Sequence, residues 1–438
     1  MTDLKQLRVL SPVPHVVFLA LLCWCFLAQP AWGQVGVSDA MSNDSAADAR
    51  VQQSQSPDYT FKKGDFSMLV VPSLSLQWND NVYLSQNDPQ DDVTILPTLD
   101  VTMSYPLTER NLLQFNVVVG YDEYLNHNTL STWYLQSGSG LSFDMYIKDV
   151  LVNFHDQFSY IQDTAENPAV ANTGTFGTFQ NSVGTTIKWG LKNVVFTLGY
   201  DHQNGLSTSG ELSQVDHSGE TGYARAGYKW NSKLTTGFET TASSTAYAET
   251  VLNDNVSYSI GLYGDWEPSD FLKIEPRAGY VIDEFSQSSR DLRTSDVSSW
   301  YADLKVSHDI TRAITYTLDV GREVDPGIQS DVNVNWHINS TIIWNIIKGN
   351  TIRTALFFQH GNQGQGSSLI SSLANPNLVS EVYDWYGGEI SLSHALTSRW
   401  SVSLDYRITQ RDSSAANRGY TQNLVGLQLM YQPRHTAP

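Results

Sequence analysis

Cysteine is nearly absent from this sequence, and its two cysteines, Cys23 and Cys25, both lie within the first 25 residues. The rest of the chain therefore has no thiol that could form a disulfide or a thiolate metal site. Basic residues are also scarce, with 26 Lys and Arg against 45 Asp and Glu and a formal net charge of −19. Contacts to nucleic-acid phosphates need clustered Lys and Arg, so this acidity argues against nucleic acid as a partner.

Long apolar runs are missing as well. The longest, from Val16 to Ala28, has about 13 residues, fewer than the roughly 20 that a membrane-spanning helix needs. If the chain crosses a membrane, its membrane-spanning segments are therefore not helices. Lys5 and Arg8 precede this run and Ala31-Trp32-Gly33 follows it, which is the pattern of a secretory signal peptide. We predict cleavage before Gln34, with an uncleaved helical anchor as the alternative. Loss of a signal of charge +1 changes the net charge from −19 to −20.

From Gln34 to about Lys63 the sequence consists mainly of Ser, Asp, Ala, Gln and Asn, and its first aromatic residue is Tyr59. Such a segment buries too little apolar surface to offset the entropy lost on ordering. We therefore expect a disordered periplasmic lead-in. The predicted organisation is a signal peptide at 1–33, this N-terminal segment at 34–63, a barrel at 64–432 and a C-terminal tail at 433–438.

Beyond this segment, apolar and polar residues alternate with the period of a β-strand. Positions 402, 404, 406 and 408 are apolar, for example, whereas 401, 403, 405, 407 and 409 are polar. Counting such segments gives eighteen strands, at 67–84, 92–105, 111–125, 131–147, 150–163, 178–190, 193–204, 217–230, 233–246, 254–266, 271–286, 298–309, 312–324, 331–346, 350–361, 380–395, 399–410 and 419–432.

The lengths of these segments and of their connections predict the architecture. Most segments run for 12 to 18 residues, longer than the usual strand of about 5 to 6 and suited to tilted strands that cross a bilayer. Tight turns such as 147–150 alternate with longer loops rich in Asn, Ser, Asp and Gly. This pattern predicts an all-β protein, a transmembrane up-and-down antiparallel β-barrel of about 18 strands (16–18).

Aromatic residues favour the same location. Tryptophans near strand ends, such as Trp189, Trp230 and Trp344, would form the girdles at the two membrane interfaces, whereas in a soluble sheet they would be core. The last strand alternates up to an aromatic residue, Tyr431, and resembles the closing strand that the barrel-assembly machinery of the outer membrane reads. The expected surroundings are outer-membrane lipid and lipopolysaccharide.

The most specific local pattern lies in the first two predicted strands. An aromatic-x-Asp-Asn-hydrophobic-aromatic strand end, Trp78 to Tyr83, is followed by an Asp-rich loop and a second strand that contains proline. This pattern resembles the β-barrel porin-2 type of outer-membrane protein, sharply over 72–125 and only in architecture beyond. The residues that carry it are Trp78, Asp80, Asn81, Tyr83, Asp92 and Pro97. Many such proteins accompany genes for exopolysaccharide synthesis and export, so the resemblance implies polysaccharide export components as partners.

Motifs for catalysis are not found. There is no Gly-rich phosphate loop, His-Glu-x-x-His pattern or nucleophile elbow. Histidines that adjoin carboxylates, as in His155-Asp156, cannot pair with these neighbours because adjacent strand residues point to opposite faces. We therefore expect no enzyme, no cofactor and no metal. A calcium site formed by loop aspartates is an alternative to a simply solvated acidic loop, and its ligands would be Asp80, Asp88, Asp91 and Asp92.

Directing the polar face of each strand inward gives a predicted pore lining. Its members are Arg225, Lys229, Glu239, Lys273, Glu275, Arg277, Asp303, Lys305, Asp319, His337, Asp405 and Arg407. Charges of both signs occur, so selectivity should be weak; alternatively, these charges only pair across strands to hold the wall. The loops around 163–178 and 361–380 are the candidates to narrow the lumen, and the composition of the second suits sugars better than ions.

Together these features predict an outer-membrane barrel, with its N-terminus in the periplasm, that forms a passive and weakly selective pore for small hydrophilic solutes. The solutes that we consider first are saccharides. The role that we consider first is a part in exopolysaccharide export. The alternative is a non-conducting surface barrel, plugged by its loops, with an adhesion or scaffolding role. A barrel hydrolase, with Ser, His and Asp converging from different strands, is the second alternative.

Overall fold

The computed structural model describes residues 59–162, 167–174, 176–208, 210–347, 349–364, 367–369 and 380–433. The predicted signal peptide, most of the predicted 34–63 segment and nearly all of the C-terminal tail lie outside these residues. The last residues of the 34–63 segment form a short strand, β1 (Phe61–Lys63), that pairs with the beginning of the barrel. Within the described ranges, no helix has the length and apolarity needed to cross a membrane.

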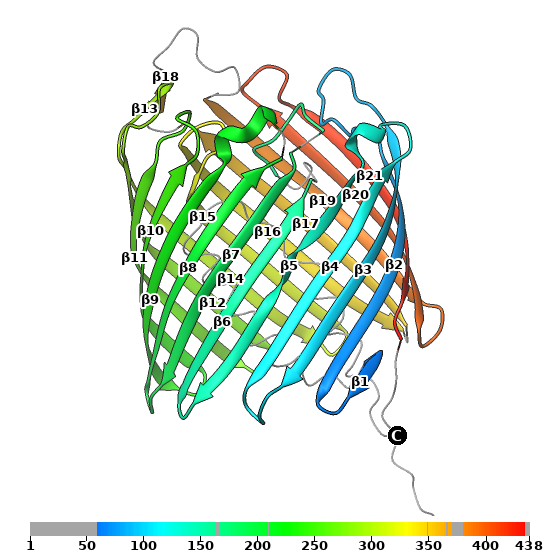
Figure 1. The fold of residues 1–438 in the computed structure, drawn as a ribbon, viewed down its shortest axis with the longest axis vertical. Helices are drawn as coiled ribbons and strands as arrows, with labels where there is room; N and C mark the ends of the chain where they lie inside the picture. The colour runs from blue at the N-terminus through cyan, green and yellow to red at the C-terminus, as the bar shows by residue number, and fades with distance from the viewer. Residues whose placement is uncertain are drawn as a thin grey trace, which may run out of the picture.

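Eighteen long strands form a closed antiparallel sheet in chain order, and β1 is the nineteenth strand of that sheet (Figure 1). The barrel strands are β2 (Phe66–Asn79), β3 (Asp92–Pro106), β4 (Leu112–Tyr124), β5 (Thr132–Ile147), β6 (Val150–Ile161), β7 (Thr178–Gly190), β8 (Val194–Ser207), β9 (His217–Asn231), β10 (Leu234–Tyr247), β11 (Asn255–Ser269), β12 (Leu272–Phe285), β14 (Val297–Thr311), β15 (Ile314–Pro326), β16 (Val332–Ile347), β17 (Asn350–Gln363), β19 (Glu381–Ala395), β20 (Trp400–Ser413) and β21 (Tyr420–Tyr431). The predicted closed barrel and its strand number are confirmed.

The barrel closes where β2 pairs with β21, the first long strand with the last. This seam has seven register pairs, from Ser73 opposite Met430 to Asn79 opposite Leu424, whereas β2 and β3 share thirteen. The predicted first strand extended to residue 84, but β2 ends at Asn79 because the next residues turn away and bind β21 through their side chains. The seam thus has a short backbone ladder, which is extended by a backbone hydrogen bond from Asp80 to the carbonyl of Asn423 at 3.2 Å and by the side chains of Asp80 and Asn81.

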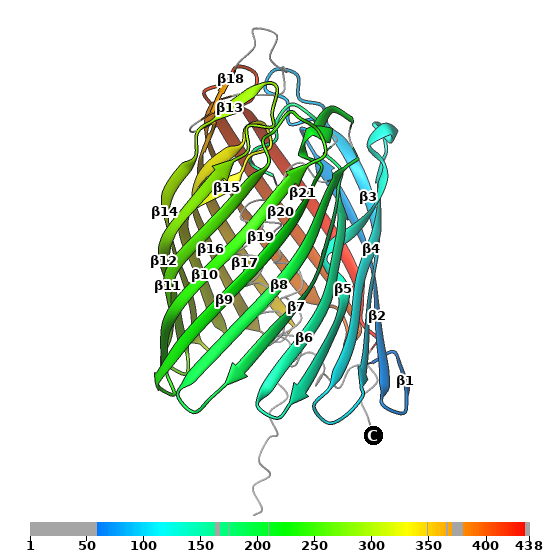
Figure 2. The same ribbon diagram turned by 60° about the vertical axis from the view of Figure 1, so that its left-hand side comes forward.

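The two ends of the barrel differ. Short turns join the strands at the end that carries β1 and the last residues of β21, and long connections lie at the other end (Figures 1 and 2). The long connections contain the short helices η2 (Asn128–Leu130) and η4 (Gly210–Val215). They also contain β13 (Leu292–Thr294) and β18 (Ser367–Leu369), which pair with each other.

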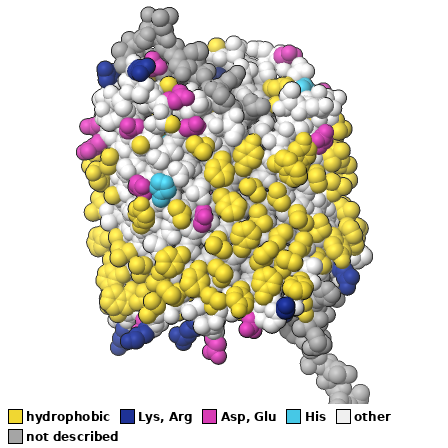
Figure 3. Space-filling view, in the orientation of Figure 1, with side chains coloured by type: hydrophobic (Ala, Val, Ile, Leu, Met, Phe, Trp, Pro, Cys, Tyr) yellow, Lys and Arg dark blue, Asp and Glu magenta, His cyan; other side chains and the backbone are white. Residues whose placement is uncertain are grey.

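The face in Figure 3 carries a broad apolar belt, with most charged side chains toward its two ends and a histidine and a few carboxylates within the belt. Alternation along the strands builds the belt, as on β10, where Phe238 is 66% exposed and the next residue, Glu239, is 4% exposed. The same contrast recurs on β16, where Ile338 is 45% exposed and the His337 side chain is 13% exposed. Most apolar side chains therefore face outward and most polar ones face the interior, the arrangement of a barrel surrounded by lipid.

Candidate functional site in the barrel interior

The interior face of β9 to β14 holds a charged cluster around one carboxylate. Glu239 accepts hydrogen bonds from Arg225 at 2.9 Å, from Arg277 at 3.0 Å and from the hydroxyl of Tyr301 at 3.0 Å. Tyr301 can reach Glu239 across two strands because Gly261 has no side chain. A Cβ at Gly261 would lie 2.1 Å from the Tyr301 hydroxyl. All of these donors lie on strands other than β10, so this part of the wall is joined across several strands by one buried anion.

Other predicted pore-lining residues make fewer contacts. Lys273 donates a hydrogen bond to Glu275 at 2.8 Å, and both belong to β12. The Arg407 guanidinium lies 5.5 Å from the centre of the Phe357 ring. The pairing registers place further predicted residues on this inner face, because Arg277 lies opposite Asp303 and Glu275 lies opposite Lys305. Lys229 and Asp405 continue the alternation of β9 and β20. Whether these twelve residues line a conducting path stays a prediction.

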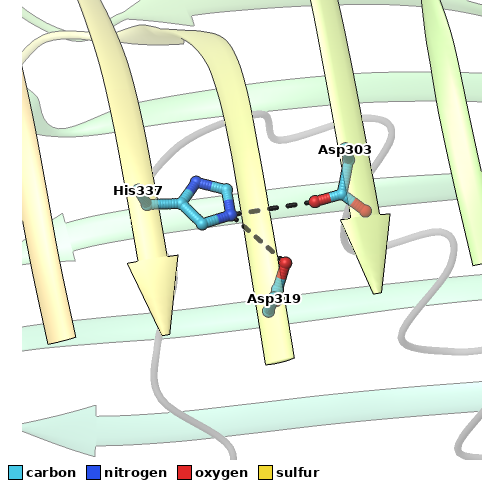
Figure 4. Close-up of side chains that lie close together, drawn as sticks. All are labelled: Asp303, Asp319 and His337. Carbon is cyan, nitrogen blue, oxygen red and sulfur yellow. Dashed lines mark hydrogen bonds and ion pairs between the residues drawn. The ribbon is translucent and has the colours of Figure 1, made fainter. Parts of the chain in front are cut away.

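A second polar group gathers on β14, β15 and β16, as Figure 4 shows for three of its side chains. His337 Nε2 lies 3.3 Å from an oxygen of Asp319 and 3.7 Å from an oxygen of Asp303. The other ring nitrogen, Nδ1, lies 2.8 Å from Glu323. One histidine thus faces three carboxylates. The sequence analysis named three of these residues separately and missed Glu323, although Glu323 shares the alternation of Asp319.

A buried ion cluster near the loop end was also missed. Glu381 on β19 and Arg411 on β20 are fully buried and 2.7 Å apart, and Arg418 lies 3.0 Å from the other oxygen of Glu381. Arg411 Nε donates to the carbonyl of Pro168 at 2.7 Å, and Arg418 donates to the carbonyl of Ala169 at 2.8 Å. The hydrogen bonds from these two arginines fix the position of the β6–β7 connection at the loop end of the barrel. Arg411 shares the polar alternation of β20, but the sequence gives no sign of its distant partner.

Apolar residues from several long connections pack together at the loop end, in a group that we call the mouth cluster. It consists of Ala169, Val170, Phe176, Leu212, Val215, Leu252, Leu292 and Ile328. The connections that supply Val170 and Ile328 are eight barrel strands apart in one direction and ten in the other, so they are nearly opposite in the ring. The mouth cluster therefore extends across the barrel mouth. This agrees with the expectation that the loop around 163–178 narrows the lumen.

Polar contacts support the mouth cluster. Asp331, between β15 and β16, accepts hydrogen bonds at 2.7 Å from both the backbone and the side-chain nitrogen of Asn253. Thr294 donates to it as well. Burial raises the pKa of Asp331 above its ordinary value of 3.8, and the hydrogen bonds from Asn253 and Thr294 oppose this rise. Three connections are thus joined at one aspartate.

The residues of the porin-2 resemblance lie at the seam and at the adjoining loops. Asp80 accepts two hydrogen bonds of 2.6 Å, from the backbone and the side-chain nitrogen of Asn423 on β21. The Asn81 side chain donates to the carbonyl of Ser85 at 2.8 Å and to that of Thr421 at 3.0 Å. Asp80 and Asn81 therefore join the end of the first barrel strand to the last one.

The remaining residues of the resemblance position the neighbouring loops. Asp92 accepts hydrogen bonds from the backbone nitrogens of Asn126 and His127, at 3.1 and 2.8 Å, and lies 2.9 Å from His127 Nδ1. The Tyr83 ring packs edge-on against His127, with ring centres 5.3 Å apart. Pro97 lies opposite Leu74, where the β3–β4 pairing is interrupted.

The four loop aspartates that were considered as calcium ligands do not converge in the described structure. Asp80 and Asp92 already accept hydrogen bonds from amide groups in two different places. Asp91 accepts a hydrogen bond from the Trp78 indole at 3.5 Å, and Asp88 accepts one from Gln90 at 3.1 Å. Among the described residues, the one group of three or more His, Cys, Asp or Glu with converging ligand atoms is Asp303, Asp319 and His337.

No family model matches the sequence, and no curated protein matches it. The porin-2 resemblance therefore stays a prediction. Solved structures with a similar fold include Pseudomonas aeruginosa OccK2 (OpdF) in complex with glucuronate, at 10% identity and a TM-score of 0.47, covering 84% of this chain and 98% of that one. P. aeruginosa OpdK matches at 11% identity and 0.44, with the same coverages. Acinetobacter baumannii OccAB3 matches at 11% identity and 0.43, covering 84% and 99%.

Proposed function

We propose that this protein is an outer-membrane pore that passes small hydrophilic solutes passively and with weak selectivity. The observation that carries the proposal is the contrast between the two faces of the closed barrel. Its outer face is an apolar belt, and its inner face carries arginines, lysines and carboxylates. Arginine and lysine on a lipid-facing surface cost about 2–4 kcal/mol at the bilayer midplane and carboxylates cost less, so this distribution fits lipid outside and water inside.

The size of the barrel supports an aqueous interior. Rings of 16 to 18 strands leave a water-filled channel, whereas side chains fill a ring of about eight strands. Charges of both signs lie on the inner wall, as in the cluster of Glu239 with Arg225 and Arg277. Such a wall should conduct ions of either sign and discriminate weakly among small solutes.

The mouth cluster favours a second candidate function. Loops that pack across the mouth could leave a barrel that does not conduct and instead acts at the cell surface in adhesion or scaffolding. In the pore proposal, the same cluster is the narrowest point of the path and sets the size of the solutes that pass. The two candidates differ in one measurable property, which is conductance.

Single-channel recording in a planar bilayer tests the proposal. We expect stable conductance steps from the refolded chain, and larger steps from Ile328→Asp, because a carboxylate cannot stay in the apolar mouth cluster. The matched control is Leu107→Asp, which places the same change on an exposed residue at the short-turn end and should leave the steps unchanged. Silence from both the parent chain and Ile328→Asp, with verified β-structure, would instead support the surface barrel.

Location and solute belong to the same proposal. We propose that the short-turn end of the barrel, and with it the N-terminal segment, faces the periplasm. The position of β1 at the short-turn end supports this, since bacterial outer-membrane barrels have short turns on the periplasmic side. Fractionation of a diderm host tests this, since a soluble periplasmic product would contradict it. The link to saccharides and exopolysaccharide export rests on the sequence resemblance, and block of the conductance steps by oligosaccharides would support it.

A further inference from the structure

Three side chains of types that ligate metals converge on the inner wall, from three neighbouring strands. Figure 4 shows them: Asp303 on β14, Asp319 on β15 and His337 on β16. One ligand atom from each residue lies within 4.8 Å of the others. A nitrogen and two carboxylate oxygens at these separations can reach one common ion with small side-chain movements, because ligand distances to a first-row metal are about 2.0–2.2 Å.

The orientation of the histidine is fixed by a fourth residue. Glu323 lies 2.8 Å from His337 Nδ1, on the side of the ring away from the two aspartates. A carboxylate on one ring nitrogen keeps the proton there and leaves the lone pair of the other nitrogen for a metal, the usual second contact of a metal-bound histidine. Nε2 is the nitrogen that faces Asp303 and Asp319.

The strand between Asp303 and His337 has no side chain in the space where the ligand atoms converge. Gly321 on β15 lies directly between Asp303 and His337 in the pairing register. A Cβ at this position would lie 2.9 Å from Asp303 Oδ2 and 2.9 Å from His337 Nε2, and 2.5 Å from His337 Cε1. Any other residue would therefore occupy the space where the ligand atoms converge. This cradle is a second observation, independent of the ligand types.

We propose that Asp303, Asp319 and His337 bind one divalent transition-metal ion of the zinc class on the inner wall, with Glu323 orienting the histidine. An imidazole nitrogen with two carboxylates favours zinc and its neighbours over calcium, which takes six to eight oxygens. Three protein ligands leave a coordination position for water. A bound dication also offsets the three carboxylates around one imidazole. The alternative is an imidazolium that is held by the carboxylates without a metal.

Metal binding is measured without conduction, so its outcome is separate from that of the proposed function. The untagged full-length chain, refolded in detergent, is titrated with Co²⁺, whose visible absorption reports coordination, and then with Zn²⁺. We expect one Co²⁺ per chain, displaced by Zn²⁺. His337→Gln should weaken binding at least 100-fold, and Glu323→Gln should weaken it about 10- to 100-fold.

The matched control is His360→Gln. His360 also lies next to a carboxylate, 2.7 Å from Asp384, but belongs to no group of three converging ligands among the described residues, so its loss should leave Co²⁺ binding unchanged. If His337→Gln does not fold, Gly321→Ala provides the second variant, because its Cβ enters the cradle. Equal Co²⁺ binding by the parent chain and the folded His337 or Gly321 variant would overturn the proposal, as would an equal loss in His360→Gln.

Discussion

The closing seam should depend on Asp80 more than on any neighbouring loop aspartate. Its carboxylate accepts two hydrogen bonds of 2.6 Å from Asn423, and the backbone ladder of the seam has seven register pairs. Hydrogen bonds to a charged group each contribute about 1.5–3 kcal/mol. Because Asp80 is half-buried, we take the lower end of this range for each of the two hydrogen bonds and expect Asp80→Ala to cost the seam about 3 kcal/mol.

A loss of this size raises the population of the opened seam roughly 150-fold, because each 1.4 kcal/mol is about a factor of ten. Hydrogen exchange measures it directly, because the Asn423 backbone nitrogen donates one of the two hydrogen bonds to Asp80. We expect faster exchange in the β21 peptide around Asn423, and little change in peptides from β10 or β11, which lie far from the seam in the ring.

Asp88→Ala is the matched control, since Asp88 is exposed in the same loop and its oxygen accepts a hydrogen bond from Gln90, two residues away. It should leave exchange in β21 unchanged. If Asp80→Ala and Asp88→Ala behave alike, the side chain of Asp80 does not stabilise the seam, and the assignment of this motif to barrel closure is wrong.

Three further changes test the wall and the loops. Glu239→Gln removes a buried anion from two half-buried arginines, so we expect a loss of about 3 kcal/mol and a reversal potential shifted toward anions. Glu275→Gln, at a more exposed pair, should shift it less. Asp92→Asn weakens an acceptor of several hydrogen bonds, so amides of the β4–β5 connection should exchange faster. The raised pKa of Asp331 means that the folded loops favour its protonated form. That stabilisation is complete below the ordinary pKa of 3.8 and is lost as the pH rises through the raised pKa. As the pH rises over this interval, the thermal midpoint of the parent chain should therefore fall relative to that of the Asp331→Asn variant.

The strands were predictable because alternation is a local property. Every predicted segment overlaps one barrel strand, and the twelve predicted inner residues alternate with apolar ones on their own strands. One strand has a polar residue on its otherwise apolar face. Asp156 shares a face with Phe154, and the continuous β6–β7 register shows no bulge between them. Its carboxylate accepts a hydrogen bond from Asn181 at 2.6 Å, which satisfies one of its oxygens on the outer face.

Contacts between side chains on the inner wall were not predictable in the same way. Tyr301 reaches Glu239 over the backbone of two intervening strands, and His337 reaches Asp303 over β15. Both contacts require glycine in each strand that they cross, Gly261 and Gly279 for Tyr301 and Gly321 for His337. Alternation gives the face of each side chain, but the reach of a side chain along that face depends on which neighbouring positions lack a Cβ.

The mouth is the least predictable part of the barrel, because its contacts join residues far apart in the sequence. Arg411 binds the carbonyl of Pro168, 243 positions away, and Gln214 binds that of Ile328, 114 positions away. Neither loop carries a periodic pattern, and the entropy of closing such long loops is recovered only when the whole ring has formed. The strands therefore determine the diameter of the barrel, whereas the loops determine what passes, so conductance should respond more to Ile328 than to any single charge on the wall.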